Sequence, residues 1–216
     1  MNAITQPDAR DWTSLPFDGM DYTLGLQQGV KDLRIAYSPN LGYAKNVHPD
    51  IAVATAQAAQ YLQDLGAHVE QVDPGIEDPL DITTGLWFAG AYQVWRTLSQ
   101  EQQALTDPDF AAQAAIGETL DANALHQLNQ RRGLLGSHLR QFMQRFDLIL
   151  TPSTAVPAFK ALPAGHSAMN SEAMLGWTPF SYPFNLSQQP AISLPCGLTA
   201  DGLPMGVQLV GPMFAD

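Results

Sequence analysis

Cysteine is almost absent from this sequence, and charged side chains are few. Cys196 is the single cysteine among 216 residues, and charged residues make up 14% of the chain. One cysteine excludes an internal disulfide framework and is typical of a reducing compartment, so we expect a cytoplasmic protein. The five histidines show no ligand spacing, and with one thiol they argue against a structural zinc site. We therefore expect no metal and no cofactor.

Basic residues and long apolar runs are also scarce. The chain carries 10 Lys and Arg against 21 Asp and Glu, which gives a net charge of −11. Such an acidic surface repels the phosphates of nucleic acids and of anionic lipids. No apolar run is long enough to span a membrane, and residues 1–10 are too polar for a signal-peptide core. We expect neither a nucleic-acid partner nor a membrane partner.

What the sequence does contain is a large apolar fraction, 45% of the residues, enough for a sizeable core. Residues 31–75 predict a βαβ unit with parallel strands, in which Pro49 begins the helix and Gly66 ends it. We divide the chain into a connector (1–30), this unit (31–75), a helical block (76–146) and a last region of strands and pocket-wall loops (147–216). The expected strands are 33–37, 68–72, 147–151, 191–194 and 207–210, and the expected helices of the block are 79–98, 108–119 and 121–146. The predicted class is α/β, with one mixed sheet covered by helices.

Residues 177–212 are the most informative stretch. An aromatic segment opens it, and Pro179 and Pro183 predict an extended backbone there. Two short strands follow, which we expect to be buried, and Ala200-Asp201-Gly202 predicts the turn between them. Pro195 lacks a backbone N–H, so it marks a strand end or a sheet edge.

Three motifs lie in this stretch: Pro183-Phe184-Asn185, then Pro190 to Gly197, then Gly202 to Gly211. They resemble the C-terminal part of the amidase signature family, whose members read Pro-Phe-Asn, Gly-x-Pro-Ala-x-Ser-x-Pro-x-Gly and Gly-x-Pro-x-Gly-x-Gln-x-x-Gly. Gln189 departs from this pattern, because members usually carry Gly there. We expect structural roles, including buried hydrogen bonds of the Asn185 amide, for the matching residues Asn185, Pro190, Ser193, Pro195, Gly197, Gly206, Gln208 and Gly211.

Amidase signature enzymes are serine hydrolases that use two serines and a lysine from a Gly/Ser-rich region. Here Lys31, Lys45 and Lys160 lie outside any such context, and the chain has no Gly-x-Ser-x-Gly or Ser-x-x-Lys sequence. No catalytic residue is therefore assigned, and Ser193 is expected to pack in its strand. The resemblance implies the C-terminal half of an amidase domain, cropped at both ends, with the N-terminal half of that domain as its partner.

The same resemblance places the residues before Pro183 near the acyl pocket. Members that release ammonia from glutamine tend to carry an acidic residue near the position of Thr178, and this chain does not. An apolar or aryl amide is therefore favoured as the small-molecule substrate. The expected pocket wall consists of Trp177, Thr178, Phe180 and Tyr182. The alternative interpretation is that the three aromatic residues only fill the core.

Together these features predict a segment of an amidase-family hydrolase that supplies pocket wall and core but is inactive by itself. The alternative is a catalytically dead binding module or accessory subunit derived from the same fold. A half-domain leaves strand edges bare, which predicts self-association. Helix starts and turns, rather than a catalytic carboxylate pair, explain the aspartates Asp78, Asp81, Asp107, Asp109 and Asp121.

Overall fold

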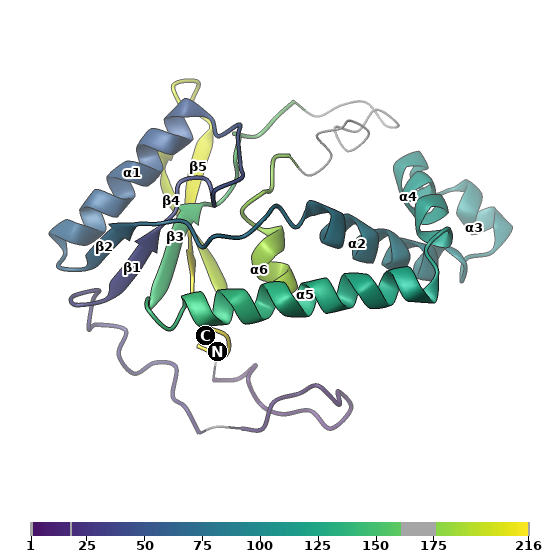
Figure 1. Ribbon diagram of the computed structural model, residues 1–216, viewed down its shortest axis with the longest axis horizontal. Helices are drawn as coiled ribbons and strands as arrows, with labels where there is room; N and C mark the ends of the chain where they lie inside the picture. Colours follow the sequence, from purple (N-terminus) through teal and green to yellow (C-terminus); the bar gives the residue numbers. More distant parts are fainter. Residues whose placement is uncertain (1, 18, 161–175, 216) are drawn as a thin grey trace.

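The computed structural model describes residues 2–17, 19–160 and 176–215. From the sequence we expect a loop with a short helix over residues 154–175, and most of that range lies outside the described residues. Residues 2–17 and 19–29 form long loops beneath the body of the molecule (Figure 1). The elements that follow are β1 (Arg34–Tyr37), α1 (Pro49–Asp64), β2 (His68–Gln71), α2 (Leu80–Trp95), α3 (Gln100–Ala104), α4 (Pro108–Glu118), α5 (Ala122–Phe142), β3 (Leu148–Pro152), α6 (Tyr182–Ser187), β4 (Ala191–Leu198) and β5 (Pro204–Val210).

All five expected strands lie in one sheet, in the order β2-β1-β3-β5-β4. Strand β1 pairs in parallel with β2 and with β3, whereas β5 pairs antiparallel with β3 and with β4. The sheet is therefore mixed, as expected. The turn between β4 and β5 is also confirmed, because Gly202 has φ +79° and its N–H donates to the Thr199 carbonyl.

The βαβ unit forms as the sequence indicates. Pro49 occupies the first turn of α1, where its missing N–H leaves no hydrogen bond unmade. His48 precedes it, and its Nδ1 accepts from the N–H of Asp50 at 3.3 Å. Gly66 follows the helix with φ +96°, a left-handed conformation that favours glycine.

Helices cover both faces of the sheet (Figure 1). On one face α1 packs over a core that includes Ile35 and Leu150. On the other face α5 and α6 enclose a second core, where Ile149 and Phe184 are almost completely buried. This second layer positions the candidate site.

Strand β4 differs from the expectation of two buried strands. Every residue of β4 is exposed except Cys196, which is half-buried. The cause is its position at the sheet edge, where β5 is its one partner among the described strands and where Cys196 packs against α1. A shift of register between Pro195 and Gly197, with Gly197 at φ +135°, interrupts its pairing with β5. Pro195 thus lies at an edge, as the sequence predicts.

The aromatic segment also departs from the prediction, because residues 182–187 form α6 rather than an extended backbone. Pro183 lies in the first turn of this helix, where a proline needs no hydrogen-bond partner for nitrogen. The helix ends at Gln188, whose φ is +58°.

The helical block projects away from the sheet (Figure 1). Asp121 caps α5, since its Oδ1 accepts from the N–H of Ala124 at 2.7 Å. Helix α5 ends at Phe142, earlier than the expected Phe146, and the sequence analysis missed α3, which starts at a capping box of Ser99 and Gln102. No helix in the described ranges is long and apolar enough to cross a membrane.

Candidate functional site

A cavity of about 490 Å³ opens where α2, α5 and α6 meet the segment before α6. Its described wall is mainly apolar and aromatic, with a few polar side chains between the rings. The lining residues are Thr83, Thr84, Leu86, Trp87, Phe88, Gln113, Arg132, Trp177, Thr178, Ser181, Tyr182, Asn185 and Leu186.

Three of the four pocket-wall residues expected from the sequence line this cavity: Trp177, Thr178 and Tyr182. Phe180 does not. Its side chain is completely buried in the core between α5 and the sheet. The aromatic segment therefore divides its side chains between the cavity and the core, because α6 and the turn before it direct them to different sides.

A tyrosine pair holds this segment in place. The hydroxyl of Tyr182 donates to Oδ1 of Asp78 at 2.7 Å, and the hydroxyl of Tyr43 donates to the Pro179 carbonyl at 2.6 Å. The two rings are stacked with centroids 6.4 Å apart. Burial raises the pKa of both hydroxyls far above the ordinary value of 10.0, and the neighbouring Asp78 carboxylate adds to the rise. Both tyrosines are thus neutral donors: Tyr182 ties α6 to the segment before α2, and Tyr43 ties Pro179 to the loop after β1.

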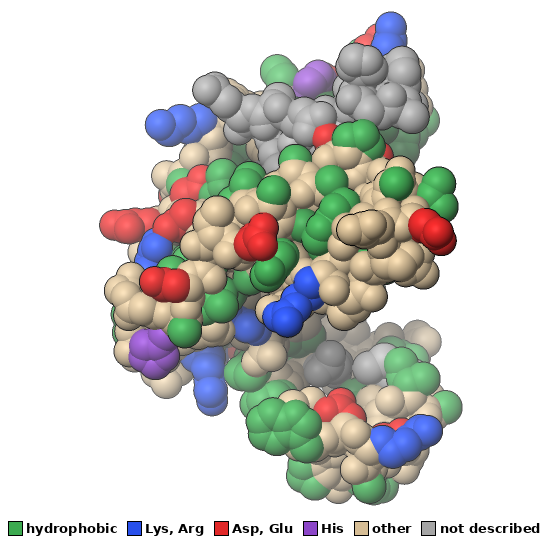
Figure 2. Space-filling model, turned by 90° about the vertical axis from the view of Figure 1, so that its right-hand side faces the viewer, with side chains coloured by type: hydrophobic (Ala, Val, Ile, Leu, Met, Phe, Trp, Pro, Cys, Tyr) green, Lys and Arg blue, Asp and Glu red, His purple; other side chains and the backbone are tan. Residues whose placement is uncertain are grey.

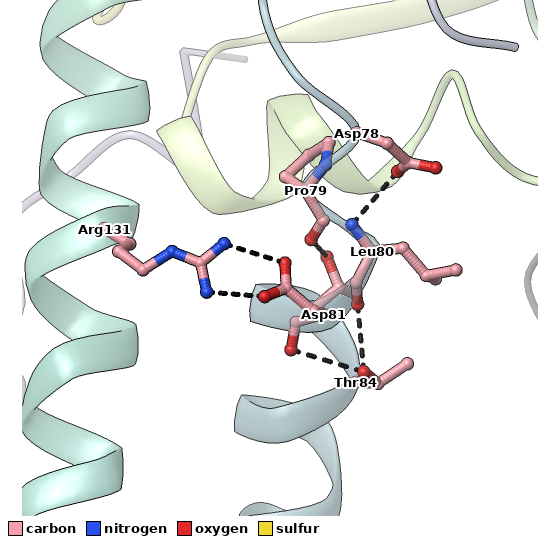
Figure 3. Close-up of polar contacts among 7 residues, drawn as sticks. Asp78, Pro79, Leu80, Asp81, Thr84 and Arg131 are labelled. Carbon is pink, nitrogen blue, oxygen red and sulfur yellow. Dashed lines mark hydrogen bonds and ion pairs between the residues drawn. The ribbon is translucent and has the colours of Figure 1, made fainter.

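The start of α2 is fixed to α5 by an ion pair (Figure 3). Arg131 places its two terminal nitrogens 2.5 and 3.0 Å from the two carboxylate oxygens of Asp81. This bidentate contact lowers the pKa of Asp81. Beside it, Oδ1 of Asp78 accepts from the N–H of Leu80 at 3.0 Å. Asp78 therefore accepts hydrogen bonds both from the start of α2 and from Tyr182, and so links two walls of the cavity.

Helices α2, α4 and α5 also contribute to the wall, and the sequence did not predict this contribution. Trp87 is 64% exposed, and its Nε1 donates to Oε1 of Gln113 at 3.1 Å. Arg132 is half-buried and donates from Nε to the Leu186 carbonyl at 2.8 Å. Two adjacent aromatic residues, Trp87 and Phe88, in a helical pattern were a sequence signal for this wall. Their position beside α6 depends on tertiary packing, which the sequence pattern does not show.

Asn185 lies elsewhere than expected. Its side chain is exposed and lines the cavity, so the expectation of a buried structural amide is wrong. The physical reason is the helix: α6 turns Phe184 and Leu186 into the protein and Asn185 outward.

Other motif residues have clear structural contacts. Gln208 is buried and donates from Nε2 to the Phe180 carbonyl at 2.8 Å and to the Thr151 hydroxyl at 3.2 Å. The N–H of Gly211 donates to the Pro190 carbonyl at 2.9 Å. A side chain at Gly206 would place its Cβ 2.9 Å from the hydroxyl oxygen of Ser153, so a larger residue there would push this hydroxyl aside.

Ser193 is exposed on β4, and its hydroxyl oxygen lies 2.6 Å from that of Ser153. Its strand is uncovered, so it does not pack inside a sheet as expected. No His or Lys side chain is hydrogen-bonded to either hydroxyl among the described residues, and a serine nucleophile needs such a base.

The described wall of the cavity contains no Lys, His, Cys or carboxylate. The described residues also contain no cluster of three His, Cys, Asp or Glu side chains that could hold a metal ion. The residues of this wall can therefore bind and orient an apolar group, with Arg132, Thr178, Ser181 and Asn185 as polar contacts.

The fold and this cavity define an α/β protein with a helix-walled cavity beside a mixed sheet. A family model described as Amidase matches residues 1–216, and the chain belongs to that family.

Comparison with individual proteins supports the same family. An acylamidase of Rhodococcus erythropolis is 28% identical over 215 residues, which covers 97% of this chain and 45% of the relative. One of the subunits of the glutamyl-tRNA(Gln) amidotransferase of Synechococcus sp. (strain CC9902) is 29% identical over 98% of this chain and 48% of that protein. The crystal structure of a bacterial aryl acylamidase superposes with a TM-score of 0.80 at 27% identity, over 94% of this chain and 44% of that one. The chain thus spans about half the length of the relatives it matches.

Proposed function

We propose that this chain forms the substrate-binding part of an amide hydrolase and that the substrate is an apolar or aryl amide rather than glutamine. The observation that carries the proposal is the aromatic wall made by Trp87, Phe88, Trp177 and Tyr182. A ring or alkyl group that enters this cavity is favoured by about 25 cal/mol for each Å² of apolar surface removed from water.

Glutamine is disfavoured by charge. Its ammonium group needs a carboxylate partner, and the described wall of this cavity has none. The position near Thr178 that the resemblance assigns to such a carboxylate is occupied here by the sequence Trp177-Thr178-Pro179. The acylamidase and the aryl acylamidase among the similar proteins support the same substrate class.

Amide cleavage also needs a nucleophile, a proton shuttle and an oxyanion hole. We assign none of these to the described residues of this chain. In the proposed enzyme they come from the N-terminal half of the amidase domain, which would complete the site beside the cavity. This chain then contributes the pocket wall and the core beneath it.

The test joins this chain in cis to the N-terminal half of the Rhodococcus acylamidase and compares hydrolysis of 4-nitroacetanilide and of glutamine. We expect turnover of the anilide and none of glutamine. Trp177→Ala should lower kcat/KM for the anilide about tenfold or more, because it removes a large apolar contact. Trp12→Ala is the matched control, since Trp12 is 95% exposed and does not line the cavity.

Preferential turnover of glutamine would refute the substrate assignment. Binding of the anilide without turnover would instead favour the alternative, a binding module or accessory subunit that keeps the pocket and lacks the chemistry. An unchanged kcat/KM in Trp177→Ala would show that the substrate lies elsewhere.

A further inference from the structure

A second cavity, of about 810 Å³, lies between α2 and α4 at the end of the helical block. Trp87, Leu86 and Gln113 line both cavities. Figure 2 views the molecule from this end and shows hydrophobic side chains between polar and charged ones.

The unusual group in this second cavity is Asp109. Only 7% of the residue is exposed, and its Oδ2 atom is buried without a hydrogen-bond partner among the described residues. Its backbone N–H donates to Oδ1 of Asp107 at 2.8 Å. The helix cap therefore involves the backbone of Asp109 and not its carboxylate. Buried polar groups almost always have partners, and an unpaired buried carboxylate is strongly disfavoured.

The surroundings of Asp109 indicate which partner is missing. The described lining contains the two carboxylates of Asp107 and Asp109 and no Lys, Arg or His, so anions are repelled. The rest of the wall is mainly apolar, with Gln113 as its other polar side chain, which does not suit a bare metal ion because such ions need several polar ligands. An ammonium group donates charge-assisted hydrogen bonds to a carboxylate, and a hydrocarbon body fits the apolar wall.

We propose that the cavity between α2 and α4 binds an organic ammonium ion with an apolar body, and that Asp109 is the residue that pairs with the nitrogen. The rings of Trp87 and Phe110 supply two further contacts, since aromatic faces attract cations. This site does not depend on the proposed amide hydrolysis.

The test is calorimetric titration of the unmodified 216-residue chain with cyclohexylmethylammonium and with cyclohexylmethanol, its neutral counterpart of similar shape. We expect the ammonium ion to bind at least about tenfold more tightly than the alcohol. Asp109→Asn should weaken ammonium binding about tenfold or more and leave alcohol binding unchanged, because a hydrogen bond to a charged group is lost.

Asp121→Asn is the matched control, because it makes the same change at the start of α5, outside the cavity. It should leave both affinities unchanged. Equal binding of the ammonium ion and the alcohol, no binding of either, or full ammonium affinity in Asp109→Asn would each overturn the proposal. If circular dichroism shows that Asp109→Asn does not fold, the ratio of ammonium affinity to alcohol affinity in the unmodified chain tests the proposal by itself.

Discussion

Gln208 on β5 donates a hydrogen bond from its side-chain nitrogen to the backbone carbonyl of Phe180 at 2.8 Å. This contact joins the central sheet to the segment that precedes α6. It also explains why one face of that segment belongs to the core while Trp177 and Tyr182, on either side of Phe180, line the cavity.

We expect Gln208→Leu to destabilise the protein by about 1–3 kcal/mol, because it leaves the Phe180 carbonyl buried and unpaired. Urea denaturation followed by circular dichroism measures the change. Gln127→Leu is the control, since Gln127 is exposed on α5 and should alter stability by less than about 0.5 kcal/mol. Equal effects of the two substitutions would mean that the hydrogen bond contributes nothing.

A second prediction concerns the contact between α2 and α4. A Cβ at Gly117 would lie 1.9 Å from the Phe88 carbonyl oxygen, so Gly117→Ala must separate the helices. We expect a loss of about 1–3 kcal/mol or more from overpacking. Gly133→Ala on α5 has no atom within 4 Å of its Cβ and should stabilise the helix by about 0.5–1 kcal/mol. Thermal denaturation of both variants should show a lower melting temperature for Gly117→Ala and a higher one for Gly133→Ala.

The tyrosine pair predicts a dependence of stability on pH. Tyr43 and Tyr182 have pKa values raised by burial above 10.0 in the folded protein. Above pH 10 the unfolded chain therefore loses protons that the folded chain keeps, and stability falls as the pH rises. The contribution is complete below pH 10 and decreases by about 1.4 kcal/mol per pH unit for each tyrosine above it.

Urea denaturation at pH 9, 10 and 11 should show this decrease. Tyr182→Phe should make this decrease shallower, because phenylalanine has no proton to lose. A stability that stays constant up to pH 11, or an unchanged slope in Tyr182→Phe, would contradict the assignment.

The uncovered edge of β4 predicts self-association of the chain. Its backbone groups are free to pair with another strand, and Ile192 is 56% exposed there. We expect Ile192→Lys to lower the mass of the associated species in light scattering at high protein concentration. Val53→Lys is a close control, since Val53 on α1 is 57% exposed but belongs to no strand edge. A chain that is monomeric before mutation would rule out this contact.

For activity, we expect the 216-residue chain alone to hydrolyse no amide above background and to remain unlabelled by a fluorophosphonate probe. Removing the nucleophile machinery of a serine hydrolase costs about 10⁶-fold in turnover. Labelling that disappears in Ser153→Ala or Ser193→Ala would show that one of these serines is activated after all.

The sheet was predictable because its strands and the turn at Gly202 rely on local signals. Short apolar runs bounded by Gly and Pro place the strands, and a helix between two strands implies a parallel pair. Burial of β4 was not predictable. An edge strand and an inner strand carry the same apolar residues, and only the sheet order separates them.

The candidate site was only partly predictable. The motif around Pro183 located the aromatic wall, but the same prolines misled the prediction of backbone conformation, because Pro183 suits a first helical turn as well as an extended chain. Trp87 and Arg132 join Trp177 through packing between helices that are distant in sequence. Asp109 lies at a helix start, as expected, in the first turn of α4, but the sequence gives no sign that its carboxylate is buried.

The pairing of β1 with β3 has a consequence for how the fold is assembled and varied. The N–H of Arg34 donates to the carboxylate of Asp147, 113 positions later in the sequence. The chain between these two adjacent strands therefore contains the whole helical block. The entropy of closing such a loop rises only with the logarithm of its length, while distant pairing slows folding. Lengthening or trimming the block should therefore change folding rate and cavity shape far more than sheet stability, which makes it the part of the molecule whose length can vary while the sheet stays intact.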